Sequence, residues 1–152
     1  MKTLLLLLLL LPFTAFGQIN WKAEIAPCAV LVFAGAADGT AESVKWHYHD
    51  QFSTTVPDND PEYWNPDISW KNKYRDGTPE SGPAYFGSTT FLAWTTDGYH
   101  LMRTTRNLMV TTAILLAPKQ KQKWHSYVIK AAIYTLSYQL GFHLTYTLIF
   151  KP

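Results

Sequence analysis

The side chains of this sequence best suited to chemistry are carboxylates and histidines at helical spacing. Asp97 and His100 stand three residues apart, so on a helix they would be neighbours on one face. A carboxylate placed there can orient an imidazole for proton transfer or help it to hold a metal. His143, in the last apolar segment, is a third candidate. We therefore predict Asp97, His100 and His143 as catalytic residues; the alternative is a structural ion pair, or a turn at Asp97-Gly98.

A second polar group follows Asp38, with Glu42, Lys45 and His49 at four, seven and eleven residues beyond it. A helix through this segment would place all four on one face. Because carboxylate and imidazole are ligands of zinc, iron and manganese, Asp38, Glu42 and His49 are candidate ligands of a divalent transition metal. One helix supplies too few ligands for a closed site. The alternative is a solvated face on which Glu42 pairs with Lys45.

A third polar set lies near the end of the chain. Thr135, Gln139, His143 and Thr147 are spaced by four and would form a stripe on an otherwise apolar helix. Polar side chains in a membrane span face other protein. The stripe therefore predicts hydrogen bonds between helices, and every candidate so far depends on helices to position it.

Long segments with few charges predict those helices. Residues 25–49 form the first, and residues 89–117 and 127–150 are long enough to cross a hydrocarbon core. Ser88 is the predicted N-cap of the second segment.

Two arginines, Arg103 and Arg106, fall in the middle of the candidate span 89–117. Charged groups at that depth need partners. The carboxylates of Asp38, Glu42 and Asp97 are the ones that could supply them.

The segment between these helices has another composition. Residues 50–87 hold five of the nine prolines together with many aromatic residues. Disordered segments contain few aromatic residues. We therefore predict an ordered loop 50–87, long enough to act as an external cap.

The N-terminus predicts export. Lys2 precedes a leucine run, and the small residues Ala15 and Gly17 precede a cleavage point before Gln18. Residues 1–17 are therefore a predicted signal peptide, with an uncleaved anchor as the alternative, and residues 18–152 a single domain.

Three lysines, at positions 119, 121 and 123, separate the candidate spans and are expected on the cytoplasmic side of an inner membrane. Two spans, 89–117 and 127–150, put these lysines inside and the loop 50–87 outside. The helix from residue 25 would then lie at the surface or be re-entrant.

A β-rich interpretation competes with the helical one. Asp38-Gly39, Asp76-Gly77 and Asp97-Gly98 favour hairpin turns, and Thr, Tyr, Val and Ile are frequent in the last third. The predicted fold is mainly α, a small helical membrane protein with an aromatic, proline-rich external loop. The alternative is a soluble β-rich periplasmic domain.

These features favour some classes of function over others. The net charge of +2 is too small to indicate nucleic acid as a partner. We predict a cell-envelope membrane protein with a periplasmic or extracellular loop and a structural or interaction role, contacting membrane lipid and an envelope protein partner. The alternatives are a membrane-embedded metal-dependent or acid–base enzyme and a soluble periplasmic binding domain.

Overall fold

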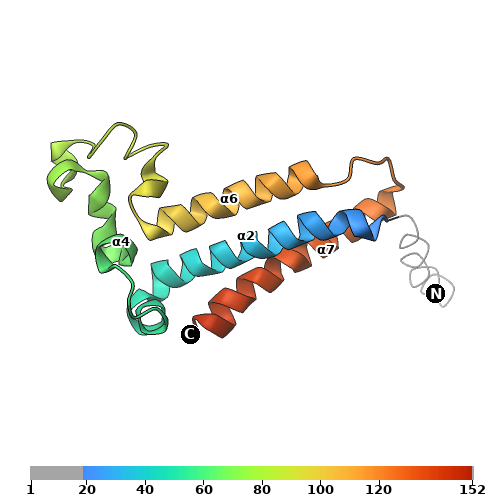
Figure 1. The fold of residues 1–152 in the computed structure, drawn as a ribbon, viewed down its shortest axis with the longest axis horizontal. Helices are drawn as coiled ribbons and strands as arrows, with labels where there is room; N and C mark the ends of the chain where they lie inside the picture. The colour runs from blue at the N-terminus through green and yellow to red at the C-terminus, as the bar shows by residue number, and fades with distance from the viewer. Residues whose placement is uncertain (1–18, 152) are drawn as a thin grey trace, which may run out of the picture.

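The computed structural model describes residues 19–151, and within them the protein is mainly helical (Figure 1). These residues contain no strand, only an isolated bridge between Tyr74 and Pro83. The mainly α prediction is therefore confirmed, and the β-rich alternative is wrong. The predicted signal peptide, residues 1–17, lies outside the described residues.

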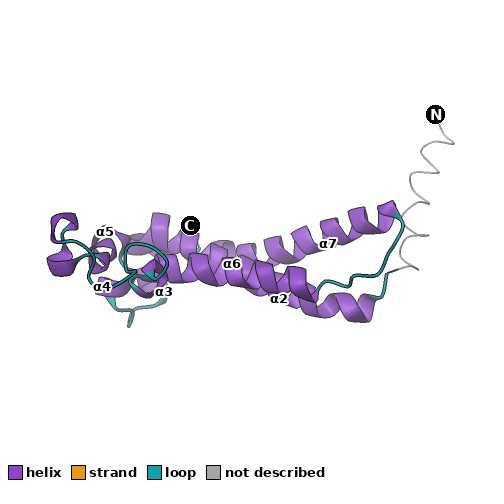
Figure 2. Ribbon diagram, turned by 90° about the horizontal axis from the view of Figure 1, so that it is seen from above, coloured by secondary structure: helices purple, strands orange, loops and turns teal. Residues whose placement is uncertain are grey.

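Three long helices run side by side in the described chain: α2 (Trp21–His47), α6 (Gly98–Leu116) and α7 (Trp124–His143). A π-helix, η6 (Leu144–Ile149), continues α7. α2 packs along both α6 and α7, which scarcely contact each other. Figure 2 shows the short helices gathered at one end of this bundle. The connector, residues 117–123, joins α6 to α7 at the other end, beside the beginning of α2 (Figure 1).

Glycines bring the backbones of α2 and α7 together. A Cβ atom on Gly35 would lie 1.9 Å from the carbonyl oxygen of Tyr138, and one on Gly141 would lie 1.8 Å from that of Val32. Gly39 is equally confined, against the Thr145 side chain. Only glycine fits these positions, as in the small-xxx-small contacts of closely packed helices. The dipeptide Asp38-Gly39 therefore lies within a helix and makes no turn.

Residues 48–97, which we call the head, form a succession of short helical turns. They are η1 (Tyr48–Phe52), α3 (Ser53–Thr55), α4 (Pro61–Trp64), α5 (Pro66–Ser69), η2 (Trp70–Lys73), η3 (Arg75–Gly77), η4 (Pro79–Ser81) and η5 (Ala93–Thr95). Asp60 and Asn65 cap α4 and α5, each with a proline in the next position. Such caps and N1 prolines start helices that are too short to be stable alone. The predicted loop 50–87 lies within the head, and short helical turns make up much of it.

An aromatic cluster closes the base of the head. Tyr48 and Phe52 pack with Val44 from the end of α2 and with Phe150, which follows η6. The ring centroids of Phe52 and Phe150 are 5.2 Å apart, and Trp64 lies against Phe52 at 5.1 Å. Phe150, which follows α7 and η6, therefore contributes to the core of the head, although the head lies between α2 and α6 in the sequence.

The helix predicted from residue 89 begins nine residues later, at Gly98. Its N-cap is Asp97, whose side chain accepts a hydrogen bond from the His100 amide. Ser88, the predicted cap, is buried and donates its hydroxyl to the Lys73 carbonyl oxygen at 2.7 Å. Its oxygen is thus engaged with the head, and Gly87 before it has a left-handed φ of 84°.

One continuous helical stretch of the described chain, Trp21–Thr55, is long and apolar enough to cross a membrane. The candidate spans 89–117 and 127–150 do not reach that hydropathy. Arg103, Arg106 and other polar residues lower it in the first, and Thr, Ser, Gln, Tyr and His interrupt the apolar residues of the second. The central helix of a soluble protein meets the same criterion, so the criterion alone assigns no membrane.

Candidate functional site

A group of charged side chains, which we call the charged seam, lies where the three long helices face one another. Arg106 of α6 donates to Asp38 of α2 at 2.9 Å. Arg103 lies 3.5 Å from Glu42 and 3.7 Å from Asp38. Tyr138 of α7 donates its hydroxyl to the second Asp38 oxygen at 2.7 Å. Of the three carboxylates that could have partnered the arginines, Asp38 and Glu42 do so, whereas Asp97 pairs with Lys73 and His100.

A second ion pair lies nearer the connector. The Lys130 ammonium of α7 is 2.7 Å from Oε1 of Glu24 on α2, and both side chains are buried. Tyr134 donates its hydroxyl to Oε2 of Glu24 at 2.5 Å. Two opposite charges held this way offset much of each other's cost of burial.

The outer surface of the helices has the opposite character. Large apolar side chains exposed on α2, α6 and α7 include Ile25, Phe33, Leu108, Ile114, Leu115, Val128, Leu136 and Leu140. Exposed tryptophans, Trp21, Trp46 and Trp124, stand near the helix ends. The bundle therefore pairs these charges between its helices, where they are buried or partly buried, and has much apolar surface outside.

The predicted pair Asp97 and His100 is joined in the head. Nδ1 of His100 lies 2.8 Å from Oδ1 of Asp97, and the buried Asp97 is also 3.4 Å from the Lys73 ammonium. Lys73 comes within 3.5 Å of Nε2 of the same imidazole. The carboxylate therefore favours the tautomer with its proton on Nδ1, which leaves Nε2 as an acceptor.

Electrostatics around Asp97 keep it ionised. Burial alone would raise the pKa of this carboxyl, but hydrogen bonds from His100 and the charge of Lys73, with that of His100 when its imidazole is protonated, outweigh burial and lower the pKa. A small cavity of about 60 Å³ adjoins the three side chains, and Ser69, Trp70 and Tyr99 also line it. It has room for one or two small groups, such as water.

The structure separates the predicted metal ligands. Asp38 and Glu42 face the arginines of the charged seam, whereas His49 lies in the head, 2.9 Å from Asp67. Lys45 lies over the ring of Trp46, so it does not pair with Glu42 as the alternative supposed. No group of three or more His, Cys, Asp and Glu side chains is arranged for a metal in the described residues.

His143 lies apart from Asp97 and His100. It is exposed at the end of α7, and its Nδ1 is 3.1 Å from the hydroxyl of Thr147, four residues on. This contact stays within its own helix. The geometry therefore joins two of the three predicted catalytic side chains.

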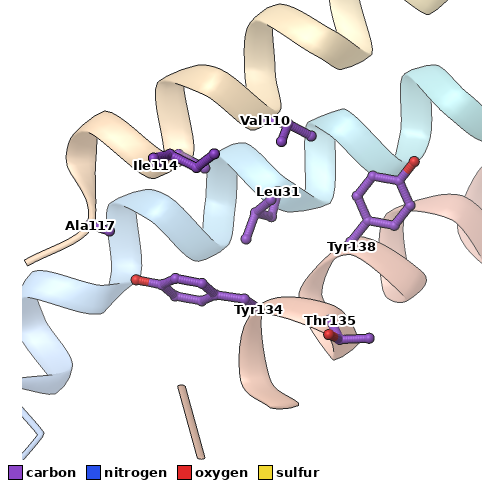
Figure 3. A pocket seen from close by; sticks show the side chains of 8 residues that line it. Leu31, Val110, Ile114, Ala117, Tyr134, Thr135 and Tyr138 are labelled. Atoms are coloured by element: carbon purple, nitrogen blue, oxygen red, sulfur yellow. The ribbon is translucent and has the colours of Figure 1, made fainter. Parts of the chain in front are cut away.

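An apolar cavity of about 390 Å³ lies between α2, α6 and α7 (Figure 3). The residues that form its walls include Leu31 of α2, Val110, Ala113 and Ile114 of α6, and Tyr134 and Tyr138 of α7. The hydroxyls of Tyr134 and Tyr138 are the ones bound to Glu24 and Asp38. Each tyrosine thus belongs both to the wall of the cavity and to a charged group.

Two features of the interior escaped sequence reasoning. The spacing of Gly35 and Gly39 is a small-xxx-small signal that could have predicted the contact between α2 and α7. Lys130 is the single charge of the segment 127–150, and Glu24 directly precedes the apolar run from Ile25, which could have suggested a pair. Lys73 gave no such signal, because its partner Asp97 is distant in the sequence and the head brings them together.

Comparison with known proteins adds no relative. No family model, no curated protein and no solved structure matches this chain.

Proposed function

We propose that the protein is a small integral membrane protein whose three-helix bundle holds an ordered head at one membrane surface, with a structural or interaction role. The distribution of charge carries this proposal. Asp38, Glu42, Arg103 and Arg106 face one another between helices, while large apolar side chains are exposed outside. In water such an apolar surface is unfavourable. In a bilayer the same arrangement is the stable one, because ionisable groups then face protein.

The helix lengths suit a bilayer. α2 has 27 residues and α6 has 19, which correspond to about 40 Å and about 28 Å at the helical rise of about 1.5 Å per residue. A hydrocarbon core is about 30 Å thick. Trp21 and Trp124 near one end and Trp46 near the other would then lie at the two interfaces, where tryptophan is enriched.

The packing of α2 favours three spans over the two expected from the sequence. α2 lies against α6 and α7, so it would cross the bilayer with them. The head and the connector would then lie on opposite sides of the membrane. The connector lysines favour a cytoplasmic connector and a periplasmic or extracellular head, whereas a signal peptide cleaved before Gln18 favours the reverse orientation.

Membrane fractionation with an alkaline carbonate wash tests the proposal. We expect the full chain to stay in the membrane pellet. Leu136→Lys places a charge on the outer surface, which costs about 3 kcal/mol at mid-bilayer, and should lower the membrane-inserted fraction. The matched variant Leu136→Phe should not. Release of the wild-type chain as a soluble monomer would overturn the proposal.

Acid–base chemistry at the head is the second candidate function. Its support is the hydrogen bond from Nδ1 of His100 to Asp97, beside a small cavity that both residues line, with Nε2 within 3.5 Å of the Lys73 ammonium. Nitrogen-15 NMR of histidine-labelled protein should show His100 with its proton on Nδ1. Asp97→Asn should shift this tautomer population, and His143→Gln should leave it unchanged. A proton mainly on Nε2 in the wild type would exclude the assignment.

A further inference from the structure

The cavity between the long helices arises from an imbalance in their packing. α6 and α7 both lie on α2 but scarcely contact each other, and the space of about 390 Å³ opens between them (Figure 3). The space is open to the outside, where Ile114 of its wall is 68% exposed. In a bilayer it would therefore be filled from the surrounding hydrocarbon, because an apolar space left empty loses dispersion contacts.

The walls favour an apolar occupant. No charged residue of the described chain lines the cavity, and Tyr134 and Tyr138 donate their hydroxyls to Glu24 and Asp38, so Thr135 adds a single hydroxyl to otherwise apolar walls. A polar ligand would lose its hydrogen bonds to water and find few replacements, which is costly. An aliphatic group would lose nothing and would gain dispersion contacts with Leu31, Val110 and the two rings.

The size of the cavity excludes a helix. An engineered apolar cavity of about 150 Å³ holds benzene, so the present one holds a considerably larger hydrocarbon. Two turns of a helix about 10 Å wide would occupy roughly 850 Å³. A second copy of this chain could therefore lie across the opening but could not fill the space. A flexible chain of methylene groups fits it.

Charge near the opening selects the kind of lipid. Ala117 lines the cavity where α6 ends, and the connector with Lys119, Lys121 and Lys123 follows directly. All three lysines are exposed. Lysines at a membrane surface attract anionic headgroups. An anionic headgroup near the connector would leave its acyl chain within reach of the cavity.

We infer that this cavity is a binding site for one acyl chain of an anionic phospholipid, drawn from the leaflet on the connector side. The inference rests on the proposed membrane function. The chain takes the place of the missing contact between α6 and α7, and the connector lysines hold the phosphate.

Photolabelling tests this site. The full chain is reconstituted into vesicles containing phosphatidylglycerol with a diazirine in one acyl chain, or phosphatidylcholine with the same chain. Crosslinked peptides are identified by mass spectrometry. We expect adducts concentrated at residues 110–117 and 134–138, stronger with phosphatidylglycerol. Replacing the three connector lysines with glutamine should abolish that preference.

Two neighbouring residues supply a matched control. Ile114 and Leu115 have side chains that are 68% and 69% exposed, but only Ile114 lines the cavity. Ile114→Trp should remove labelling at residues 134–138, and Leu115→Trp should retain it. Thr135→Trp fills the same cavity from α7 and serves if the first variant does not fold.

The outcomes separate the two proposals. Labelling spread evenly over exposed positions such as Leu140 and Leu148, unchanged by Ile114→Trp, would overturn the lipid site and leave the membrane proposal standing. Absence of labelling anywhere on the long helices would overturn both.

Discussion

Asp97 combines two structural roles in a single side chain. It caps α6 through the His100 amide and balances the charge of Lys73. Asp97→Ala removes both contributions, whereas asparagine is an equally good N-cap. We expect Asp97→Ala to be less stable than Asp97→Asn by about 1 kcal/mol, the usual value of a cap, as measured by thermal unfolding in one detergent. Equal stabilities would contradict the capping role.

The charge of Asp97 also predicts a dependence on pH. Its pKa in the folded protein lies below the ordinary value of 3.8, so ionisation stabilises the fold. That contribution is complete above pH 3.8 and is lost as the pH falls through the lowered pKa. The stability difference between wild type and Asp97→Asn should therefore shrink as the pH falls below about 4. A difference that grows in acid would contradict this assignment.

The buried pair of Glu24 and Lys130 predicts strong coupling between two residues. Lys130→Met leaves a carboxylate buried without its cation, and such changes cost about 3–5 kcal/mol. Combining it with Glu24→Gln removes the uncompensated charge, so the double variant should recover most of the loss. A double-mutant cycle on thermal unfolding measures the coupling. Additive effects would show that the pair contributes nothing.

At the scale of elements, glycine decides how α2 and α7 meet. Gly141→Leu would force a side chain against the Val32 carbonyl oxygen, and we expect it to separate the helices and lower the unfolding temperature. Ala132→Leu, at an exposed position of the same helix, is the control and should change little. Disulfide trapping between Cys28 and a cysteine introduced on α7 would report the separation directly. Unaltered trapping in Gly141→Leu would contradict the contact.

The sequence predicted these elements unevenly. Long segments with few charges were enough to predict three helices, because apolar periodicity is a local property. The beginning of α6 was misplaced, because Ser88 uses its hydroxyl for a contact with Lys73 that no local pattern shows. The pair Asp97 and His100 was predictable from its spacing. Lys73 was not, since folding of the head alone brings it to them.

At the scale of the whole molecule, the bundle predicts opposite sides for the head and the connector. Cys28 is the only cysteine, so Cys28→Ser gives a background for single reporters. Asp76→Cys in the head and Gln120→Cys in the connector should react with a membrane-impermeant maleimide from opposite sides of sealed vesicles. Labelling of both from the same side would exclude three spans. The side on which Asp76→Cys reacts also gives the orientation of the head.

The place of the first helix was the least predictable property. The lysines at positions 119, 121 and 123, expected on the cytoplasmic side, led to the expectation that this helix lies at the surface or is re-entrant. The structure instead matches Asp38 and Glu42 with Arg103 and Arg106 of α6. Sequence alone showed four ionisable groups that each needed a partner, and three-dimensional packing decided which groups met.

The position of Phe150 has a consequence for biosynthesis. Its ring packs on Phe52 in the cluster at the base of the head, although the rest of the head, α6 and α7 lie between the two residues in the sequence. A chain made from its amino terminus releases residues 48–97 from the ribosome long before residue 150. The head must therefore wait, with part of its apolar core uncovered, until α7 has been delivered beside α2. The core of the head can therefore be completed only after all three long helices have packed together.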